Sequence, residues 1–259
     1  MQKWEPTGQV SHLTLPDACS NLDVVVAWMP VGNVSVDASP PDLTGIPLVD
    51  PSEASTFVTQ KRAVEHAAGR YTLATLLRDI GFNPLELRII RDEYRKPNLI
   101  WREAEDRTKA DGKFSTKLPE ISLSHSNGVA IAAVSMDGSL IGIDAEPSDA
   151  PRPRNLLTMM ASGEELEYLE NHWSTDERVG MQESTQTWVV KEAVQKASGL
   201  GMHVSPQSFS VLNTDQVIVT HENTEYKLDV VHWRQMLAGR SFVVGFSRLI
   251  EVINLNSNR

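Results

Sequence analysis

Two hydrophobic periodicities alternate along this chain, one typical of strands and one typical of helices. Residues 128–136 form an apolar run of small and β-branched side chains, and residues 139–145 resume an extended pattern after Asp137-Gly138. Because Asp-Gly is a strong two-residue turn signal, we expect a β-hairpin here. The period of two in its second strand directs Asp144 and Glu146 to the same face.

A helix is predicted further along the chain. Residues 184–198 contain good helix formers and no proline, and Gly199 follows as a C-terminal cap. Glu192 and Lys196 are four residues apart and share a face, with Trp188 one turn earlier on the same stripe. If that face meets the hairpin, Glu192 completes a set of three carboxylates with the two acids of the strand.

Three neighbouring carboxylates carry a specific chemical implication. Their mutual repulsion is costly unless a cation or a proton lies between them. Mg²⁺ takes hard oxygen ligands, one or two carboxylates together with phosphate oxygens and water, and the sequence offers no Cys/His cluster typical of zinc. Lys196 would then lie beside the site as a positive charge for phosphate oxygens or a departing anion.

Each feature also has an ordinary structural explanation. An Asp-x-Glu pair at a strand end is usually a solvated edge, and Ser124-His125-Ser126 alone is compatible with a polar turn. A Glu-Lys pair four apart on a helix is usually a surface ion pair, worth about 0.3–0.5 kcal/mol. The order and spacing of the three motifs together favour a functional site.

These motifs resemble a known signature. Ser124-His125-Ser126, then Gly142-Ile143-Asp144-Ala145-Glu146, then Trp188-x-x-Lys191-Glu192-Ala193-x-x-Lys196 are similar in order and spacing to the motifs of the Sfp-type 4′-phosphopantetheinyl transferases. Members of that family transfer the phosphopantetheine arm of coenzyme A to a serine of an apo carrier protein and release 3′,5′-ADP. The resemblance extends from about residue 51 to the C-terminus and is strongest over residues 121–201.

The resemblance implies roles for individual residues. It assigns Mg²⁺ to Asp144, Glu146 and Glu192, with water filling the position that Ala145 cannot supply. Glu192 would accept the proton of the carrier serine, and Lys196 would offset charge on the leaving phosphate, so these two are the expected catalytic residues.

The coenzyme's phosphates are expected to contact a second group of side chains. Residues 61–70 are similar to the family's basic helix ending in Ala-Gly-Arg, and Lys96 falls where the family has Gly-Lys-Pro, with Arg95 in place of the glycine. Ordinary surface charges remain an alternative for the basic residues from these two segments. The expected coenzyme-binding residues are Arg62, Arg70, Lys96, Ser124, His125 and Lys196, with His125 near the 3′-phosphate.

The resemblance implies an α+β fold, a pseudo-duplicated arrangement of two similar lobes, each with a helix packed on a mainly antiparallel sheet. An N-terminal lobe, residues 1–140, would hold the coenzyme phosphates, and a C-terminal lobe, residues 141–259, would hold the metal-binding carboxylates and the Lys-Glu helix. One long helix is predicted over residues 54–79, with Gly81 behind it. A counterpart is predicted to begin at a capping box, Ser162-Gly163-Glu164-Glu165.

Composition limits the possible partners. The chain has 259 residues, is 41% hydrophobic and carries a net charge of −10, so it can bury a substantial core but lacks the basic excess of a general nucleic-acid binder. Carrier proteins are commonly acidic, so docking would need a local basic or apolar patch. We look for it near Lys191, Met181 and Met159-Met160, although core methionines are the alternative.

The single cysteine, Cys19, precludes an intrachain disulfide and fits a reducing compartment. No signal peptide or membrane span is evident, so a cytoplasmic location is expected. A pseudo-duplicated chain holds both lobes and could form its whole site alone, so a monomer is expected. Fatty-acid, polyketide, nonribosomal-peptide and siderophore carriers are all possible clients, with Asp-Ala-Glu-Pro and Ala-Gly-Arg leaning toward secondary metabolism. The alternatives are a magnesium-dependent phosphohydrolase and a non-catalytic relative that binds a carrier or a nucleotide.

Overall fold

The chain divides into two compact units. The computed structural model describes residues 2–32, 34, 38–102 and 117–258. The first unit comprises Met1–Glu93 and Pro97–Gly138, and the second comprises Tyr94–Lys96 and Ser139–Arg259. Each unit combines helices with an antiparallel four-stranded sheet, which confirms the predicted α+β class.

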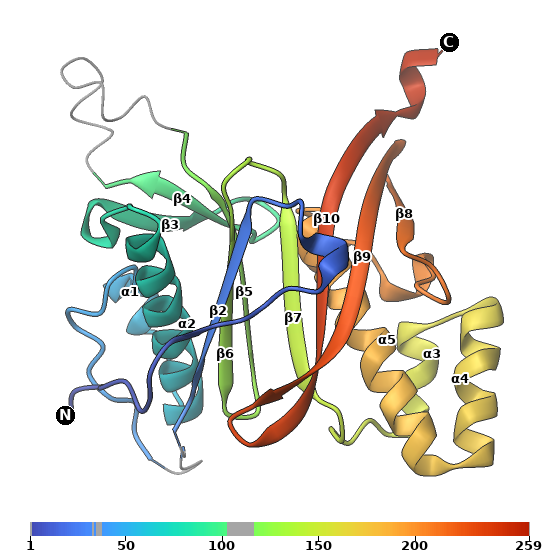
Figure 1. Ribbon diagram of the computed structural model, residues 1–259, viewed down its shortest axis with the longest axis horizontal. Helices are drawn as coiled ribbons and strands as arrows, with labels where there is room; N and C mark the ends of the chain where they lie inside the picture. The colour runs from blue at the N-terminus through green and yellow to red at the C-terminus, as the bar shows by residue number, and fades with distance from the viewer. Residues whose placement is uncertain (1, 33, 35–37, 103–116, 259) are drawn as a thin grey trace. The chain divides into compact units, whose positions relative to one another are not determined.

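The first unit contains a sheet with the strand order β1-β2-β6-β5 and a separate β3-β4 hairpin (Figure 1). Its helix α2 packs against β6, β2 and β5. Leucines of α2, among them Leu73, Leu76 and Leu77, are fully buried in the core that this packing forms. The elements are β1 Ser11–His12, β2 Val24–Pro30, α1 Pro51–Ala54, α2 Gln60–Asp79, β3 Leu87–Arg91, β4 Pro97–Trp101, β5 Glu120–Ser126 and β6 Val129–Ser135.

The long helix predicted over residues 54–79 is interrupted. The short α1 ends at Ala54, and α2 begins only at Gln60. Thr59 is extended and its hydroxyl accepts a hydrogen bond from the amide of Arg62, so it caps a new helix. Gly81 adopts the left-handed conformation just beyond the C-terminal end, as its position in the sequence suggested.

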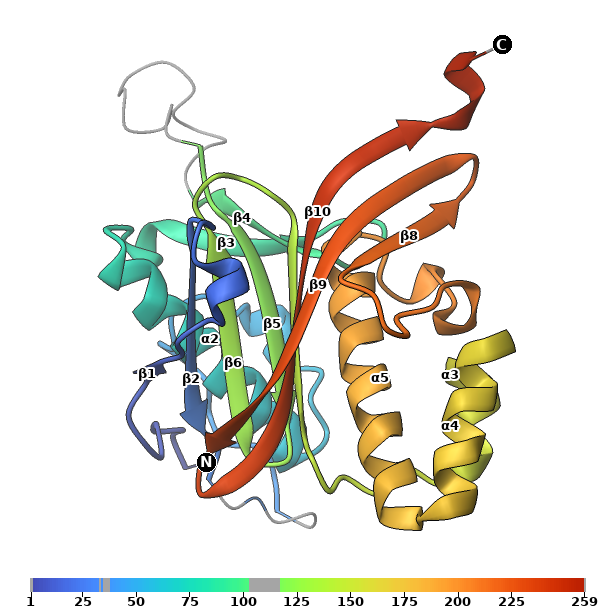
Figure 2. The ribbon, with the colours of Figure 1, turned by 45° about the vertical axis from the view of Figure 1, so that its right-hand side comes forward.

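The second unit contains a sheet with the order β7-β10-β9-β8. Helix α5 packs on β10 and β7, and α4 packs on α5; Figure 2 shows the two helices side by side. The predicted helix over residues 184–198 is confirmed, and it begins seven residues earlier. The elements are β7 Ile141–Pro147, α3 Leu157–Met160, α4 Gly163–Thr175, α5 Glu177–Ala197, β8 Gln216–His221, β9 Thr224–Leu237 and β10 Arg240–Asn254.

Short 3₁₀ helices occur at Asp17–Cys19, Pro84–Glu86, Arg154–Leu156, Gly201–His203, Pro206–Ser208 and Leu255–Asn258. No helix in the described ranges is both long enough and apolar enough to cross a bilayer.

The predicted hairpin over residues 128–145 is wrong. Strand β6 pairs with β2 on one side and with β5 on the other, so neither of its edges is open to β7. Strand β7 instead pairs with β10, more than ninety residues later in the chain. The Asp137-Gly138 turn therefore leads from a strand of the first unit to a strand of the second.

The predicted capping box at the start of α4 is also wrong, although the helix does begin at Gly163. The Ser162 hydroxyl donates to the carbonyl of Gln207 at 2.9 Å instead of capping the helix. Glu165 points away from the helix end and forms an ion pair with Lys191 at 2.6 Å. A buried lysine needs a counter-charge, and this requirement outweighs the modest gain from a capping bond.

Candidate active site

Two acids extend from the edge strand of the second sheet. Asp144 pairs with Gly245 of β10 and Glu146 pairs with Val243, so their side chains emerge two residues apart on the same face. Asp144 is 5% exposed, and the Glu146 side chain is 21% exposed. The alternation predicted for this strand therefore holds, although its pairing partner is not the predicted one.

Two glycines allow α5 to lie directly on these strands. A Cβ at Gly142 would lie 1.9 Å from the carbonyl oxygen of Ala193, and one at Gly245 would lie 2.9 Å from that of Val189. Real Cβ atoms do not make such contacts with backbone, so only glycine permits this approach. The close packing places the Glu192 and Lys196 face of α5 within reach of Asp144.

Lys196 is held firmly at this site. Its Nζ donates to Asp144 Oδ1 at 2.7 Å and to the carbonyl of Ile143 at 3.0 Å, and it lies 3.8 Å from Glu192 Oε2. Burial acts to lower the pKa of Lys196, but the charges of Asp144 and Glu192 outweigh it, and the pKa is raised. Burial, and next the charge of Asp144, raises the pKa of Glu192. Lys196 is therefore a fixed positive charge next to a carboxylate that binds a proton more readily than usual.

A second cation, Arg152, was not predicted from the sequence. It lies in the proline-rich segment after β7, with its Nη2 3.6 Å from Glu146 Oε1 and its guanidinium carbon 5.1 Å from the ring centre of Trp188. Burial lowers the pKa of Arg152, while Glu146 and the other two acids oppose that effect. The only sequence signal was its closeness to the acidic motif, six residues after Glu146.

The three carboxylates Asp144, Glu146 and Glu192 offer only hard oxygen donors, which suit Mg²⁺. Their charges interact, since Asp144 and Glu146 both act to raise the pKa of Glu192. Within the described ranges, no group of three or more His, Cys, Asp or Glu side chains is arranged to hold a metal ion, and Lys196 and Arg152 neutralise the acids instead. The donor chemistry of the three acids fits magnesium, and Lys196 and Arg152 offset most of their negative charge.

Lys191, the first lysine of the helix motif, does not contribute to an exposed patch. Its side chain is fully buried and pairs with Glu165, and its Nζ donates to the carbonyls of Pro206 and Phe209. The expectation that a carrier docks near Lys191 is therefore wrong for this residue. Of the two adjacent methionines, Met160 is in the core and Met159 is 62% exposed.

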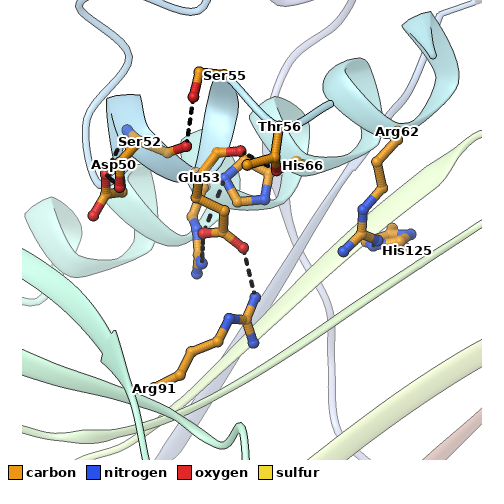
Figure 3. Close-up of polar contacts among 10 residues, drawn as sticks. Asp50, Ser52, Glu53, Ser55, Thr56, Arg62, His66, Arg91 and His125 are labelled. Atoms are coloured by element: carbon orange, nitrogen blue, oxygen red, sulfur yellow. Dashed lines mark hydrogen bonds and ion pairs between the residues drawn. The ribbon is translucent and has the colours of Figure 1, made fainter. Parts of the chain in front are cut away.

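In the first unit, α2 and β5 bring Arg62 and His125 together. Arg62 Nη1 lies 3.4 Å from Nε2 of His125, and His125 Nδ1 lies 3.4 Å from Glu65 Oε2 (Figure 3 shows the first pair). Ser124 precedes His125 on β5 and is buried. The predicted coenzyme residues Arg62 and His125 are thus neighbours, with Glu65 on the other side of the imidazole.

Arg70 lies in a different environment, 3% exposed and directed at Glu53 of α1 at 3.6 Å. Glu53 also lies 3.9 Å from His66 and accepts a hydrogen bond from Arg91 at 3.1 Å (Figure 3). Burial lowers the pKa of Arg70 to about 10. This contact gives Arg70 a structural role within the first unit, and its coenzyme role stays a prediction.

Lys96 belongs to the second unit, where its side chain runs past Gly199 at the end of α5. A Cβ on Gly199 would lie 3.6 Å from Lys96 Cδ. Arg95, which replaces the glycine of the family pattern, has a φ of 65°. The turn thus keeps a left-handed conformation even though a long side chain occupies it.

The second unit is therefore an α+β domain in which an acidic strand, a glutamate and a lysine converge at one sheet-helix contact. Residues 140–247, which include this contact, match the 4′-phosphopantetheinyl transferase superfamily. Over this region the chain is similar to that superfamily, and the match supports a transferase that handles phosphopantetheine. No curated protein matches the sequence.

Proposed function

We propose that the chain is an Sfp-type transferase that moves the 4′-phosphopantetheine arm of coenzyme A to a serine of an apo carrier protein, dependent on Mg²⁺. The observation that carries this proposal is the convergence of Asp144, Glu192 and Lys196 where α5 lies on β7. This contact lies within the region that matches the superfamily.

In the proposed reaction the carrier serine oxygen forms a bond to the β-phosphorus of coenzyme A, and the bond to 3′,5′-ADP breaks. Such a transfer needs positioning and charge neutralisation more than covalent help from the protein. Magnesium, which Asp144, Glu146 and Glu192 would hold, would supply charge neutralisation at the pyrophosphate. Glu192 accepts the serine proton, and Lys196 offsets charge on the departing 3′,5′-ADP.

We assign the coenzyme's phosphates to the basic and polar residues of the sequence motifs. The adjacent Arg62 and His125 are the strongest of these, because a guanidinium and an imidazole together favour an anion. The full set is Arg62, Arg70, Lys96, Ser124, His125 and Lys196. Titration of the protein with 3′,5′-ADP alone tests this assignment, with Arg62→Gln expected to weaken binding.

The decisive experiment is intact-mass spectrometry of apo carrier proteins incubated with the protein, coenzyme A and Mg²⁺. Fatty-acid, polyketide, nonribosomal-peptide and siderophore carriers serve as clients, with a secondary-metabolism carrier expected to react best. The expected result is a gain of one phosphopantetheine group. We expect the rate of carrier modification to fall by at least about 100-fold in Glu192→Gln, because loss of a general base typically has an effect of this size.

Glu177→Gln is the matched control, because it makes the same change in the exposed first turn of the same helix. Hydrolysis of coenzyme A without a carrier would instead indicate a magnesium-dependent phosphohydrolase. Carrier or nucleotide binding with no mass gain would indicate a non-catalytic relative. Light scattering of the purified protein tests the proposed monomer.

A further inference from the structure

The two cations at the carboxylates are held in very different ways. Lys196 makes short hydrogen bonds to Asp144 and to a backbone carbonyl. The 3.6 Å separation between Arg152 and Glu146 is too long for a hydrogen bond, and Arg152 Nε is buried with no hydrogen-bond partner in the described part of the chain. Arg152 is therefore the more easily displaced of the two.

The charge of Arg152 nevertheless acts on the whole cluster. It interacts favourably with Glu146 most strongly, and also with Asp144 and Glu192. Its guanidinium lies over the ring of Trp188, which is on the same stripe of α5 as Glu192. Pro151 and Pro153 on either side restrict the backbone, so the side chain projects from a stiff segment.

We propose that Arg152 is an internal counter-ion of the three carboxylates, held on Glu146 and Trp188 and displaced when a divalent cation binds these acids. This inference rests on the proposed function, since it concerns the same three acids. Without a metal, Arg152 and Lys196 together offset most of the negative charge that would otherwise drive the acids apart. A guanidinium that remained in place would repel the incoming cation, so its departure is part of metal binding.

Equilibrium binding of Mn²⁺ to the full-length, coenzyme-free protein, followed by electron paramagnetic resonance with Mg²⁺ as competitor, tests the proposal. Arg152→Gln is expected to bind the ion roughly tenfold more tightly, because a competing positive charge is gone. Arg152→Lys keeps the charge and is expected to stay nearer the wild type. Arg154→Gln is the matched control: it removes the same charge two residues away, from an exposed side chain whose Nη2 lies 3.4 Å from the hydroxyl of Ser174.

A second measurement follows Arg152 directly. Displacement from the Trp188 ring should change tryptophan emission when Mg²⁺ is added to the wild type, and Trp188→Phe should remove that change. This measurement needs only the wild type and Trp188→Phe, so it still tests the proposal if Arg152→Gln does not fold. Tryptophan emission that Mg²⁺ leaves unchanged in the wild type would overturn the proposal.

The proposal is also overturned if Arg152→Gln binds the ion no more tightly than Arg154→Gln, or if no variant binds it. Carrier modification is scored separately. If no carrier is modified but Arg152→Gln binds the metal ion more tightly, the proposed transferase activity is refuted and the counter-ion role of Arg152 is supported. If carriers are modified but Arg152→Gln binds the metal ion with unchanged affinity, the transferase activity is supported and the counter-ion role is refuted.

Discussion

The buried ion pair between Lys191 and Glu165 offers a sharp test of what holds the second unit together. Both side chains are at most 2% exposed, and their charged atoms are 2.6 Å apart. Lys191 Nζ also donates to the carbonyls of Pro206 and Phe209, and Glu165 accepts from the amide of Val211 at 2.7 Å. The pair thus attaches α4 and the segment after α5 to α5 itself.

Lys191→Met keeps the length of the side chain and removes its charge. Glu165 would then be a buried carboxylate without its counter-charge, which typically costs about 3–5 kcal/mol in the free energy of unfolding. Burial already lowers the pKa of Lys191, with Glu165 opposing the effect, so the lysine relies on this partner to remain charged. The double variant Lys191→Met/Glu165→Leu removes both charges and should recover most of the loss.

Urea denaturation of the four proteins of this double-mutant cycle, followed by circular dichroism, measures the coupling. We expect the summed losses of unfolding free energy in the two single variants to exceed the loss in the double variant by at least about 2 kcal/mol. Lys61→Met is the control, because its pair with Glu65 spans 3.9 Å and the lysine is 58% exposed, so it should cost about 0.5 kcal/mol or less. A loss below about 1 kcal/mol in Lys191→Met would refute the reasoning, because a buried unpaired charge costs more than that.

Three further predictions concern single positions. Gly142→Ala would place a methyl group 1.9 Å from the carbonyl oxygen of Ala193, so α5 must shift; we expect lower thermal stability and loss of transfer, and an unchanged melting temperature would contradict the packing argument. Burial, and next the charge of Arg70, lowers the pKa of His66 to about 4. Since the unfolded chain takes up this proton near pH 6.5, the free energy of unfolding should fall by up to about 3 kcal/mol as the pH drops from 6.5 to 4. His66→Gln should flatten that dependence in pH-resolved denaturation, and an unchanged dependence in this variant would contradict the assignment to His66. Arg95→Gly relieves a φ of 65° and should stabilise the protein by about 0.5–1 kcal/mol, and a lower denaturation midpoint would show that the Arg95 side chain contributes more than the strain costs.

The sequence by itself determined the local features of the candidate site. Strand periodicity placed Asp144 and Glu146 on one face, and helical spacing placed Glu192 and Lys196 on one stripe, because these patterns depend only on neighbours in the chain. The sequence shows the glycine of this motif, but it does not show why a glycine is needed there. Only the tertiary structure shows that the backbone of α5 packs directly against Gly142.

Tertiary structure alone decided which elements pair and which charges meet. The Asp137-Gly138 turn gave a correct local signal, yet β7 pairs with β10, since both edges of β6 are already occupied. Glu165 serves Lys191 instead of capping its helix, and Arg152 reaches Glu146 and Trp188. Pairing and charge compensation are long-range choices, in which burying a strand edge or an ion outweighs a local preference worth about 1 kcal/mol.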